Sequence, residues 1–147
     1  MKKEISVRNT TVEDYNYINK WWIEQGFDPP GSDILPMNGL GGVIVEKEKP
    51  IAAAYVYLTN SRMGYIDNLI SDPKYHGKDR FDVIIHLIKA CEKIARKANC
   101  REVWATSKYR GILQRCKALG YNVTEQSYGL IFANNKKNND DNNTNED

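Results

Sequence analysis

The sequence predicts an α/β fold: a mixed sheet of about seven strands with helices on both faces, in the order β-α-β-β-β-α-β-α-β-β. Three observations support this prediction. Short runs rich in Val, Ile and Tyr have the composition of strands. Longer stretches repeat their apolar residues at helical spacing. Turn residues, mainly Gly, Pro and Asn, separate the runs, so each element ends before the next begins.

The first half of the chain predicts a strand at residues 4–8, where apolar and polar side chains alternate, followed by a helix. Thr11 offers an N-cap with Asp14 three positions later, close to a capping box, and Gly26 fits the helix stop. The apolar face of this helix consists of Val12, Tyr15, Ile18, Trp21 and Trp22. Residues 27–38 contain three prolines and predict a loop.

The middle of the chain predicts three antiparallel strands, at residues 41–46, 51–58 and 64–71. A long helix follows at residues 80–97, with Asn99 as its stop. Its predicted apolar stripe consists of Phe81, Ile84, Ile85, Ile88, Cys91 and Ala95.

The C-terminal part predicts a strand at residues 101–106 and a short helix at 109–118 that ends at Gly120. Residues 121–124 and 128–132 then close the sheet as a hairpin. Residues 133–147 contain only Asn, Asp, Lys, Glu and Thr after Ala133, so this tail has too little apolar surface to bury and is expected to be disordered.

The composition predicts one domain, residues 1–132, in a cytoplasmic protein. The 147 residues are 41% hydrophobic and 27% charged, with a net charge of +2, which argues against nucleic-acid binding by composition alone. The longest apolar run, residues 51–58, is too short to span a membrane as a helix. Three cysteines without metal-ligand spacing predict reduced thiols and no metal site.

The layout resembles the GNAT superfamily of acetyl-CoA-dependent N-acyltransferases, over roughly residues 5–132. Two local patterns add to the shared element order: Asp72-Pro73-x-Tyr75-x-Gly77-Lys78 and Leu119-Gly120-Tyr121. The sequence also resembles divergent GNAT-like proteins found in bacteriophage genomes. The resemblance implies that the fourth strand splays from the fifth to admit the pantetheine arm of acetyl-CoA.

The resemblance places a pyrophosphate-binding loop between the strand that ends near Ser71 and the long helix. The family's three conserved loop positions fall on His76, Asp79 and Phe81, and none of them carries the usual residue. Free N–H groups at a helix N-terminus favour phosphate binding. The predicted cofactor-binding residues are therefore Leu69, Ile70, Ser71, His76, Gly77, Lys78, Asp79 and Arg80, with Lys74 as further positive charge. In the alternative interpretation, Asp79 caps the helix and no phosphate binds.

The resemblance also suggests catalytic candidates. The backbone N–H groups of Leu69, Ile70 and Ser71 would hold the thioester carbonyl. Asp67, with Asn68 beside it, is the candidate base. The family's general-acid position holds Cys116 here, and Tyr109 and Tyr128 are further candidates. For each of these residues, a structural role is the alternative.

Several aromatic and polar side chains are candidates for binding the acceptor amine, since ring faces attract cations. The predicted substrate-binding residues are Trp22, Phe27, Tyr57 and Asn60, with Trp21 and Tyr55 nearby in the sequence. Packing in the core is the alternative for the tryptophans. The last helix is basic through Lys108, Arg110, Arg115 and Lys117, which suggests either CoA phosphate contacts or a solvated face.

The leading functional hypothesis is an N-acyltransferase that moves an acetyl group from acetyl-CoA to a primary amine by direct attack in a ternary complex. The alternative is a non-catalytic GNAT-like binding or regulatory protein that has lost CoA and binds a protein partner. A homodimer is a further expectation from the resemblance. A nucleic-acid accessory role would rest only on the basic last helix.

Overall fold

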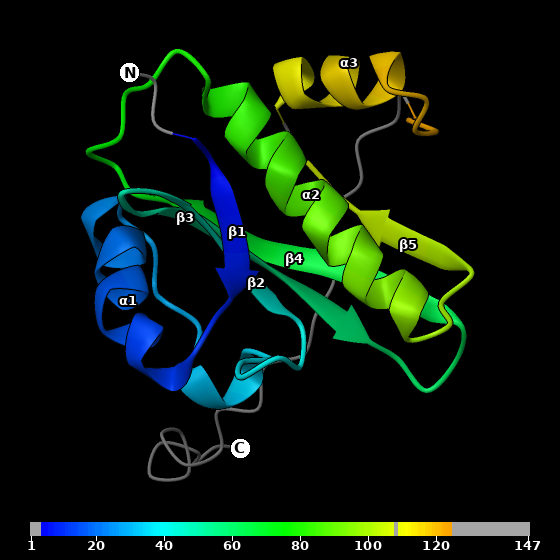
Figure 1. Ribbon diagram of the computed structural model, residues 1–147, viewed down its shortest axis with the longest axis horizontal. Coiled ribbons are helices and arrows are strands. Elements are labelled where there is room, and N and C mark those ends of the chain that lie inside the picture. Colours follow the sequence, from blue (N-terminus) through cyan, green and yellow to red (C-terminus); the bar gives the residue numbers. More distant parts are fainter. Residues whose placement is uncertain (1–3, 108, 125–147) are drawn as a thin grey trace, which may run out of the picture.

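A five-stranded mixed sheet forms the centre of the fold (Figure 1). The computed structural model describes residues 4–107 and 109–124. The strands are β1 Ser6–Asn9, β2 Gly42–Lys47, β3 Lys49–Leu58, β4 Met63–Ser71 and β5 Glu102–Ala105. The helices are α1 Tyr15–Glu24, α2 Arg80–Lys97 and α3 Arg110–Ala118, with short 3-10 turns at Val12–Asp14 and Ser32–Ile34.

The strands follow one another across the sheet in chain order. β1 to β4 pair antiparallel, and β5 joins β4 in parallel after the crossover through α2. The predicted α/β class and the predicted element order through the last helix are confirmed. Residues 121–124, predicted as a strand, have no regular secondary structure, while residues 128–132 and the tail at 133–147 lie outside the described residues.

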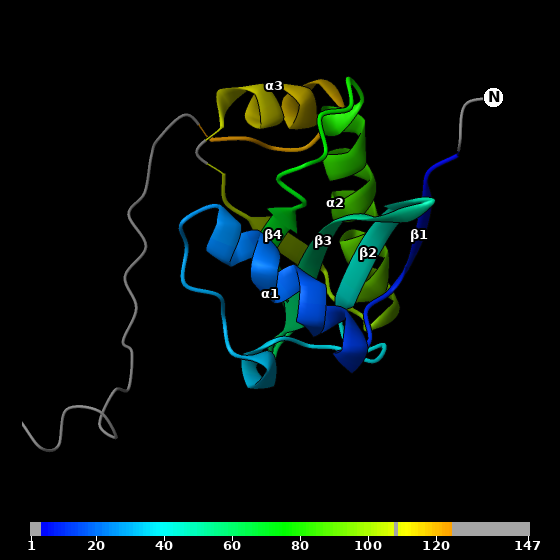
Figure 2. The same cartoon turned by 90° about the vertical axis from the view of Figure 1, so that its left-hand side faces the viewer.

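Two helices cover opposite faces of the sheet (Figure 2). α2 packs on the face formed by Val43, Val45, Ala52, Ala54, Val56 and Ile66, all of them buried. α1 packs on the other face, where Ile18, Trp21 and Trp22 meet Ile44, Ala53, Tyr55 and Ile70. β2 and β3 therefore bury side chains on both faces, which explains why their sequences are almost continuously apolar.

The buried stripe of α2 differs from the predicted one. Val83, Ile84, Leu87, Cys91 and Ala95 are buried, whereas Phe81 and Ile85 are only half-buried. Ile84, Cys91 and Ala95 are buried as predicted, and the prediction missed Val83 and Leu87, which complete a row of residues four apart from Val83 to Ala95. Phe81 instead packs beside α3, with the Arg115 guanidinium 4.5 Å from its ring centre.

The predicted helix stops are confirmed by backbone conformation. Gly26, after α1, has a φ of 83°, and Asn99, after α2, has a φ of 68°. Both angles belong to the left-handed region that ends a helix, which glycine and asparagine adopt at lower cost than other residues. The N–H of Cys100 then donates to the carbonyl of Ala95 at 2.9 Å and closes the end of α2.

A partly buried ion pair joins β1 to the start of α1. Two guanidinium nitrogens of Arg8 donate to the carboxylate of Asp14 at 2.8 and 2.9 Å, and the Thr11 backbone N–H donates to the same carboxylate at 2.7 Å. Tyr17 also donates its hydroxyl proton to Asp14, and Arg8 reaches Glu46 on β2. Burial alone raises the pKa of Asp14, but these donors outweigh it and hold the pKa well below its usual range.

Asp14→Asn is expected to lower the free energy of unfolding by about 2–3 kcal/mol at pH 7, because Arg8 loses its charged partner. Since the pKa of Asp14 is depressed in the folded state, its stabilisation is present above the unfolded pKa of roughly 4 and is lost as the pH falls. Urea unfolding at pH 7 and pH 3 measures both effects. The difference in the free energy of unfolding between wild type and variant should be smaller at pH 3 than at pH 7. An equal difference at the two pH values would contradict this role for the ionised carboxylate.

Candidate functional site

β4 changes its backbone conformation at Asn68, where a β-bulge interrupts its pairing with β3. Between the pairs Tyr55–Asp67 and Ala53–Ile70, two residues of β4 face one residue of β3. Asn68 has a φ of 55°, a left-handed conformation that asparagine tolerates better than most residues with a side chain. Bulges of this kind redirect the backbone and are common beside functional sites.

β5 leaves β4 just before this bulge. Their pairing covers residues 63–66 of β4 and ends at Ile66 and Ala105. Among the described residues, that edge of β4 has no strand partner from residue 67 to residue 71. Because successive N–H groups of a strand point to opposite edges, some of the N–H groups of this segment face the side that β5 has left. Leu69, Ile70 and Ser71, the predicted carbonyl-binding residues, lie in this segment.

Three polar side chains gather at the bulge. The Asn68 side-chain amide donates to the hydroxyl oxygen of Tyr57 at 2.6 Å. Asp67 lies opposite Tyr55 in the register, so its side chain is on the α1 face of the sheet. Burial raises the pKa of Tyr57, the Asn68 hydrogen bond lowers it, and the charge of Asp67 raises it, with a net increase. The structure therefore brings the predicted base Asp67 and the predicted substrate residue Tyr57 together.

The loop between β4 and α2 carries its own negative charge. Asp79 occupies the N-cap position of α2, but its carboxylate caps no helix N–H. The carboxylate instead accepts a hydrogen bond from the Tyr75 hydroxyl and pairs with Lys47 of β2 at 2.9 Å. These two donors, Tyr75 first, hold the pKa of Asp79 below its usual range. Asp79 is therefore the N-cap residue by position, as the alternative interpretation expected, although its side chain bonds to no helix N–H.

Gly77 makes room for this arrangement. A Cβ atom at Gly77 would come within 2.2 Å of the Tyr75 hydroxyl and 2.6 Å of an Asp79 carboxylate oxygen. The sequence predicted Gly77 as a cofactor-binding residue and gave no sign of the contact of Tyr75, Asp79 and Lys47. The spacing Tyr75-x-Gly77-x-Asp79 was visible in the sequence, but Lys47 lies on another strand and gave no signal.

The first turn of α2 retains donors that could meet an anion. The N–H groups of Arg80, Phe81 and Asp82 precede the first intrahelical bond, which Val83 donates to Asp79 at 3.0 Å. His76, Lys78 and Arg80 have exposed side chains. Within the described ranges, neither Lys78 nor Arg80 forms an ion pair. The structure thus places the predicted cationic residues at the helix start with their charges uncompensated.

Solved structures share this arrangement of elements, although no family model and no curated protein matches the sequence. An acetyltransferase from Trypanosoma brucei matches with a TM-score of 0.64 at 18% identity, over 88% of this chain and 100% of its own. A GNAT-family acetyltransferase from Streptococcus pneumoniae matches with a TM-score of 0.58 at 12% identity, over 90% of this chain and 100% of its own. An aminoglycoside N-acetyltransferase in complex with CoA matches with a TM-score of 0.58 at 20% identity, over 90% of this chain and 95% of its own.

The chain has a divergent GNAT fold. Identities this low establish the arrangement of the backbone, and the chemistry of the site must come from its own residues. In this GNAT fold the described sheet ends at β5, and the bulge of β4 lies where the predicted splay begins.

α3 lies against the start of α2 and gives its residues structural contacts. A Cβ at Gly111 would come within 3.0 Å of the Phe81 ring, and Arg115 approaches Asp82 at 3.8 Å. A solvated face was one of the two roles predicted for the basic residues of this helix. Arg115 does not fit that role, because it contacts Phe81 and Asp82. Arg110 and Lys117 are exposed, and residue 108 lies outside the described residues.

The candidate general acids on this part of the chain lie at different depths. Cys116 is half-buried, and burial raises the pKa of its thiol, so the thiol keeps its proton. Tyr109, at the N-cap of α3, is 58% exposed. Tyr128 lies outside the described residues. Tyr121, at the end of α3, donates to Glu92 at 2.9 Å, which ties α3 to α2.

The other predicted substrate-binding residues are spread over the fold. Trp22 is buried in the core beneath α1, and Phe27 is 53% exposed after the end of that helix. Asn60 is exposed in the turn between β3 and β4. Only Tyr57 of this group has a contact with the bulge, through Asn68.

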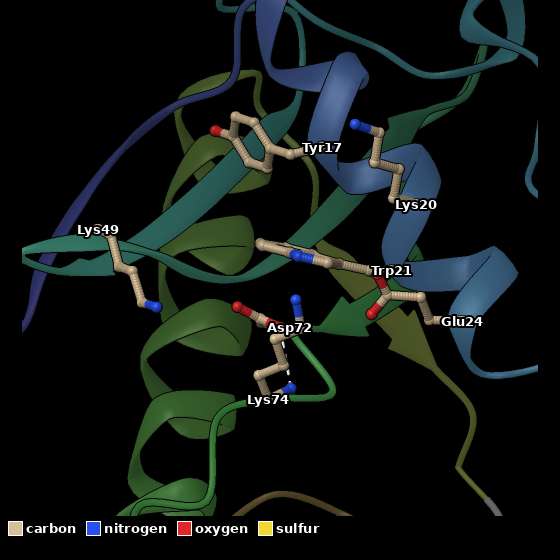
Figure 3. Close-up of a pocket in the computed structure, with 7 residues that line it drawn as sticks. All are labelled: Tyr17, Lys20, Trp21, Glu24, Lys49, Asp72 and Lys74. Carbon is tan, nitrogen blue, oxygen red and sulfur yellow. Dashed lines mark hydrogen bonds between the residues drawn. The ribbon is translucent and has the colours of Figure 1, made fainter.

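A pocket of about 210 Å³ lies between α1 and the loop after β4 (Figure 3). Tyr17, Lys20, Trp21 and Glu24 line it from α1, and Lys49, Asp72 and Lys74 line it from the sheet side. Lys74 donates its backbone N–H to Asp72 at 2.9 Å. Lys74, expected near the pyrophosphate, thus contributes to a pocket beside α1.

A second pocket, of about 240 Å³, lies at the other end of β4, between Arg62, Met63, Arg101 and Glu102. The bulge residues line neither pocket. In the part of the chain that the structure describes, no helix is long and apolar enough to span a bilayer. The same residues contain no group of three His, Cys, Asp or Glu side chains arranged to bind a metal ion.

Gly77→Ala is expected to lower the free energy of unfolding by about 1–2 kcal/mol, because the new methyl group displaces the Tyr75 hydroxyl from Asp79. Thermal unfolding monitored by circular dichroism measures the change. Tyr75→Ala in the Gly77→Ala background is the control, since it removes the nearer of the two side chains that the methyl group meets. If the double variant loses as much unfolding free energy as the two single variants lose together, the contact between the methyl group and Tyr75 is contradicted.

Proposed function

We propose that the protein is an acetyl-CoA-dependent N-acyltransferase that transfers the acetyl group to a primary amine by direct attack in a ternary complex. The observation that carries this proposal is the β4 bulge at Asn68, placed where β5 stops pairing. It leaves backbone donors on an open strand edge, and such fixed donors are the groups that stabilise the oxyanion of acyl transfer.

The residues around the bulge suggest how binding and reaction would be divided. The N–H groups of the segment from Leu69 to Ser71 that point to the open edge would hold the thioester carbonyl. The first turn of α2, with Lys78 and Arg80, would hold the phosphates of CoA. Asp67, exposed beside the bulge, would accept a proton from the amine through water, because the neutral amine is the nucleophile.

Asp79 is the feature that opposes this function. A carboxylate beside the first turn of α2 repels phosphate and competes for its donors. Lys47 and Tyr75 compensate this charge in the described structure. The fit to CoA is thus good at the strand edge and at the cations, and reduced at Asp79.

This same observation favours a second candidate function. The carboxylate of Asp79, held by Lys47 and Tyr75, would take the role of the missing anion and keep the loop folded without CoA. The protein would then be a non-catalytic binding factor on a GNAT scaffold, with exposed Phe27, Ile23 and Ile34 available to a protein partner.

The proposal includes a cytoplasmic location, which rests on three cysteines that form no disulfide. A bacteriophage origin and a homodimer remain predictions from the sequence resemblance.

Titration calorimetry with acetyl-CoA separates the two functions. Wild type is expected to bind with a micromolar dissociation constant. Asp79→Gly should bind about tenfold more tightly, because it removes a negative charge and frees Lys47. Glycine is tolerated at an N-cap, so the helix start is expected to persist.

Lys78→Ala with Arg80→Ala is the matched control, and it should weaken binding severalfold at low salt and less at high salt. Binding by Asp79→Gly alone would favour the non-catalytic factor. No binding by either protein would contradict the acyltransferase assignment.

A further inference from the structure

The hydroxyl of Tyr57 differs from the hydroxyls of four other tyrosines of this protein, which donate their protons to protein acceptors. Tyr15 donates its proton to the Pro30 carbonyl, Tyr17 and Tyr75 to carboxylates, and Tyr121 to Glu92. Tyr57 instead accepts a hydrogen bond, from Asn68, and no protein acceptor takes its own proton within the described residues. Its proton is therefore available to a bound molecule.

Asn68 fixes the position of this hydroxyl relative to the reacting segment. Its left-handed backbone forms the bulge, and its side-chain amide holds the Tyr57 oxygen at 2.6 Å. The Asn68 side chain thus links the Tyr57 hydroxyl directly to the strand segment whose backbone would bind the thioester. One residue sets both the strand conformation and the orientation of the phenol.

The protonation state suits a donor. Burial and the negative charge of Asp67 raise the pKa of Tyr57, so the hydroxyl keeps its proton at neutral pH. The alternative donor on the last helix, Cys116, has no hydrogen-bond partner that orients its thiol in the described structure. Tyr55, the neighbour of Tyr57 on β3, is fully buried and is out of reach of a substrate.

We infer that Tyr57 donates the proton to the departing CoA sulfur and that Asn68 is the positioning residue for it. This inference rests on the proposed acyltransferase function. The amine nitrogen forms a bond to the carbonyl carbon, and the C–S bond then breaks with its electron pair moving to sulfur. Tyr57 gives its O–H proton to that sulfur, and the tyrosinate recovers a proton from the nitrogen of the new amide through water. The products are the acetylated amine and CoA thiol.

Steady-state release of CoA thiol from acetyl-CoA tests this role. The acceptor is whichever of putrescine, glucosamine and a lysine peptide gives the fastest release with wild type. Tyr57→Phe should lower kcat about 100-fold, the scale of lost general acid catalysis. The KM and the calorimetric Kd for acetyl-CoA should stay within about twofold, because the phenol acts on the leaving group rather than on CoA binding.

Asn68→Gly separates the side chain of Asn68 from its backbone. Glycine adopts the positive φ of the bulge, so the fold and the Kd should be retained, while kcat falls about tenfold because the phenol is no longer oriented. Tyr65→Phe is the control, because Tyr65 lies on β4 of the same sheet and its hydroxyl contacts Thr106 at 3.2 Å. Loss of this hydroxyl should change kcat less than about twofold.

A spectroscopic signature that does not depend on turnover completes the test. In protein labelled at the ring carbon that bears the hydroxyl, acetyl-CoA should shift the carbon-13 resonance of Tyr57 in wild type and in Tyr65→Phe. An unshifted Tyr57 resonance with bound acetyl-CoA, or a Tyr57→Phe enzyme with unchanged kcat, would overturn the role while leaving the acyltransferase function intact. A wild type that neither binds acetyl-CoA nor releases thiol would overturn both.

Discussion

The left-handed backbone of Asn68 is the constraint on which the candidate site depends. It lets β4 keep its pairing with β3 on either side of a bulge while its outer edge separates from β5. The parallel crossover through α2 brings β5 back beside the first half of β4 only. Backbone donors that a regular sheet would use internally therefore remain on the second half. The same residue anchors Tyr57, so backbone geometry and side-chain chemistry are coupled at one position.

A second feature, the compensated carboxylate at the start of α2, sets the limits of this site. Phosphate-binding loops leave their helix N-terminus open to the ligand. Here Asp79 brings a negative charge to that position, and Lys47 and Tyr75 balance it from β2 and from the loop. The fold has thus kept the elements that would bind CoA while one side chain opposes it. The balance between Asp79 and the uncompensated Lys78 and Arg80 decides which function prevails.

Local patterns in the sequence predicted much of the fold. The strand runs, the helix stops at Gly26 and Asn99 and the element order through α3 follow from short-range propensity, and the structure confirms them. The predicted stripe of α2 was right at Ile84, Cys91 and Ala95 and missed Val83 and Leu87. Phe81, predicted in the stripe, packs beside Gly111, a contact that no local pattern reveals. In the site, the assignment of carbonyl binding to Leu69, Ile70 and Ser71 of β4 stays a prediction. The sequence could not predict the bulge, the bond from Asn68 to Tyr57 or the ion pair from Lys47 to Asp79, because these join residues on different strands.

The central claim is that the β4 segment at residues 67–71 and the first turn of α2 bind one acyl-CoA molecule together. An amide-resolved NMR titration of nitrogen-15 labelled protein with acetyl-CoA tests it most directly, because it observes the backbone donors themselves. The largest shifts are expected at Leu69, Ile70 and Ser71 and at Arg80 to Asp82, all saturating at one ligand concentration. Shifts confined to the pocket between α1 and the loop after β4, which Trp21 lines, would contradict a site that spans the bulge and the helix. Shifts at only one of the two segments would contradict it as well.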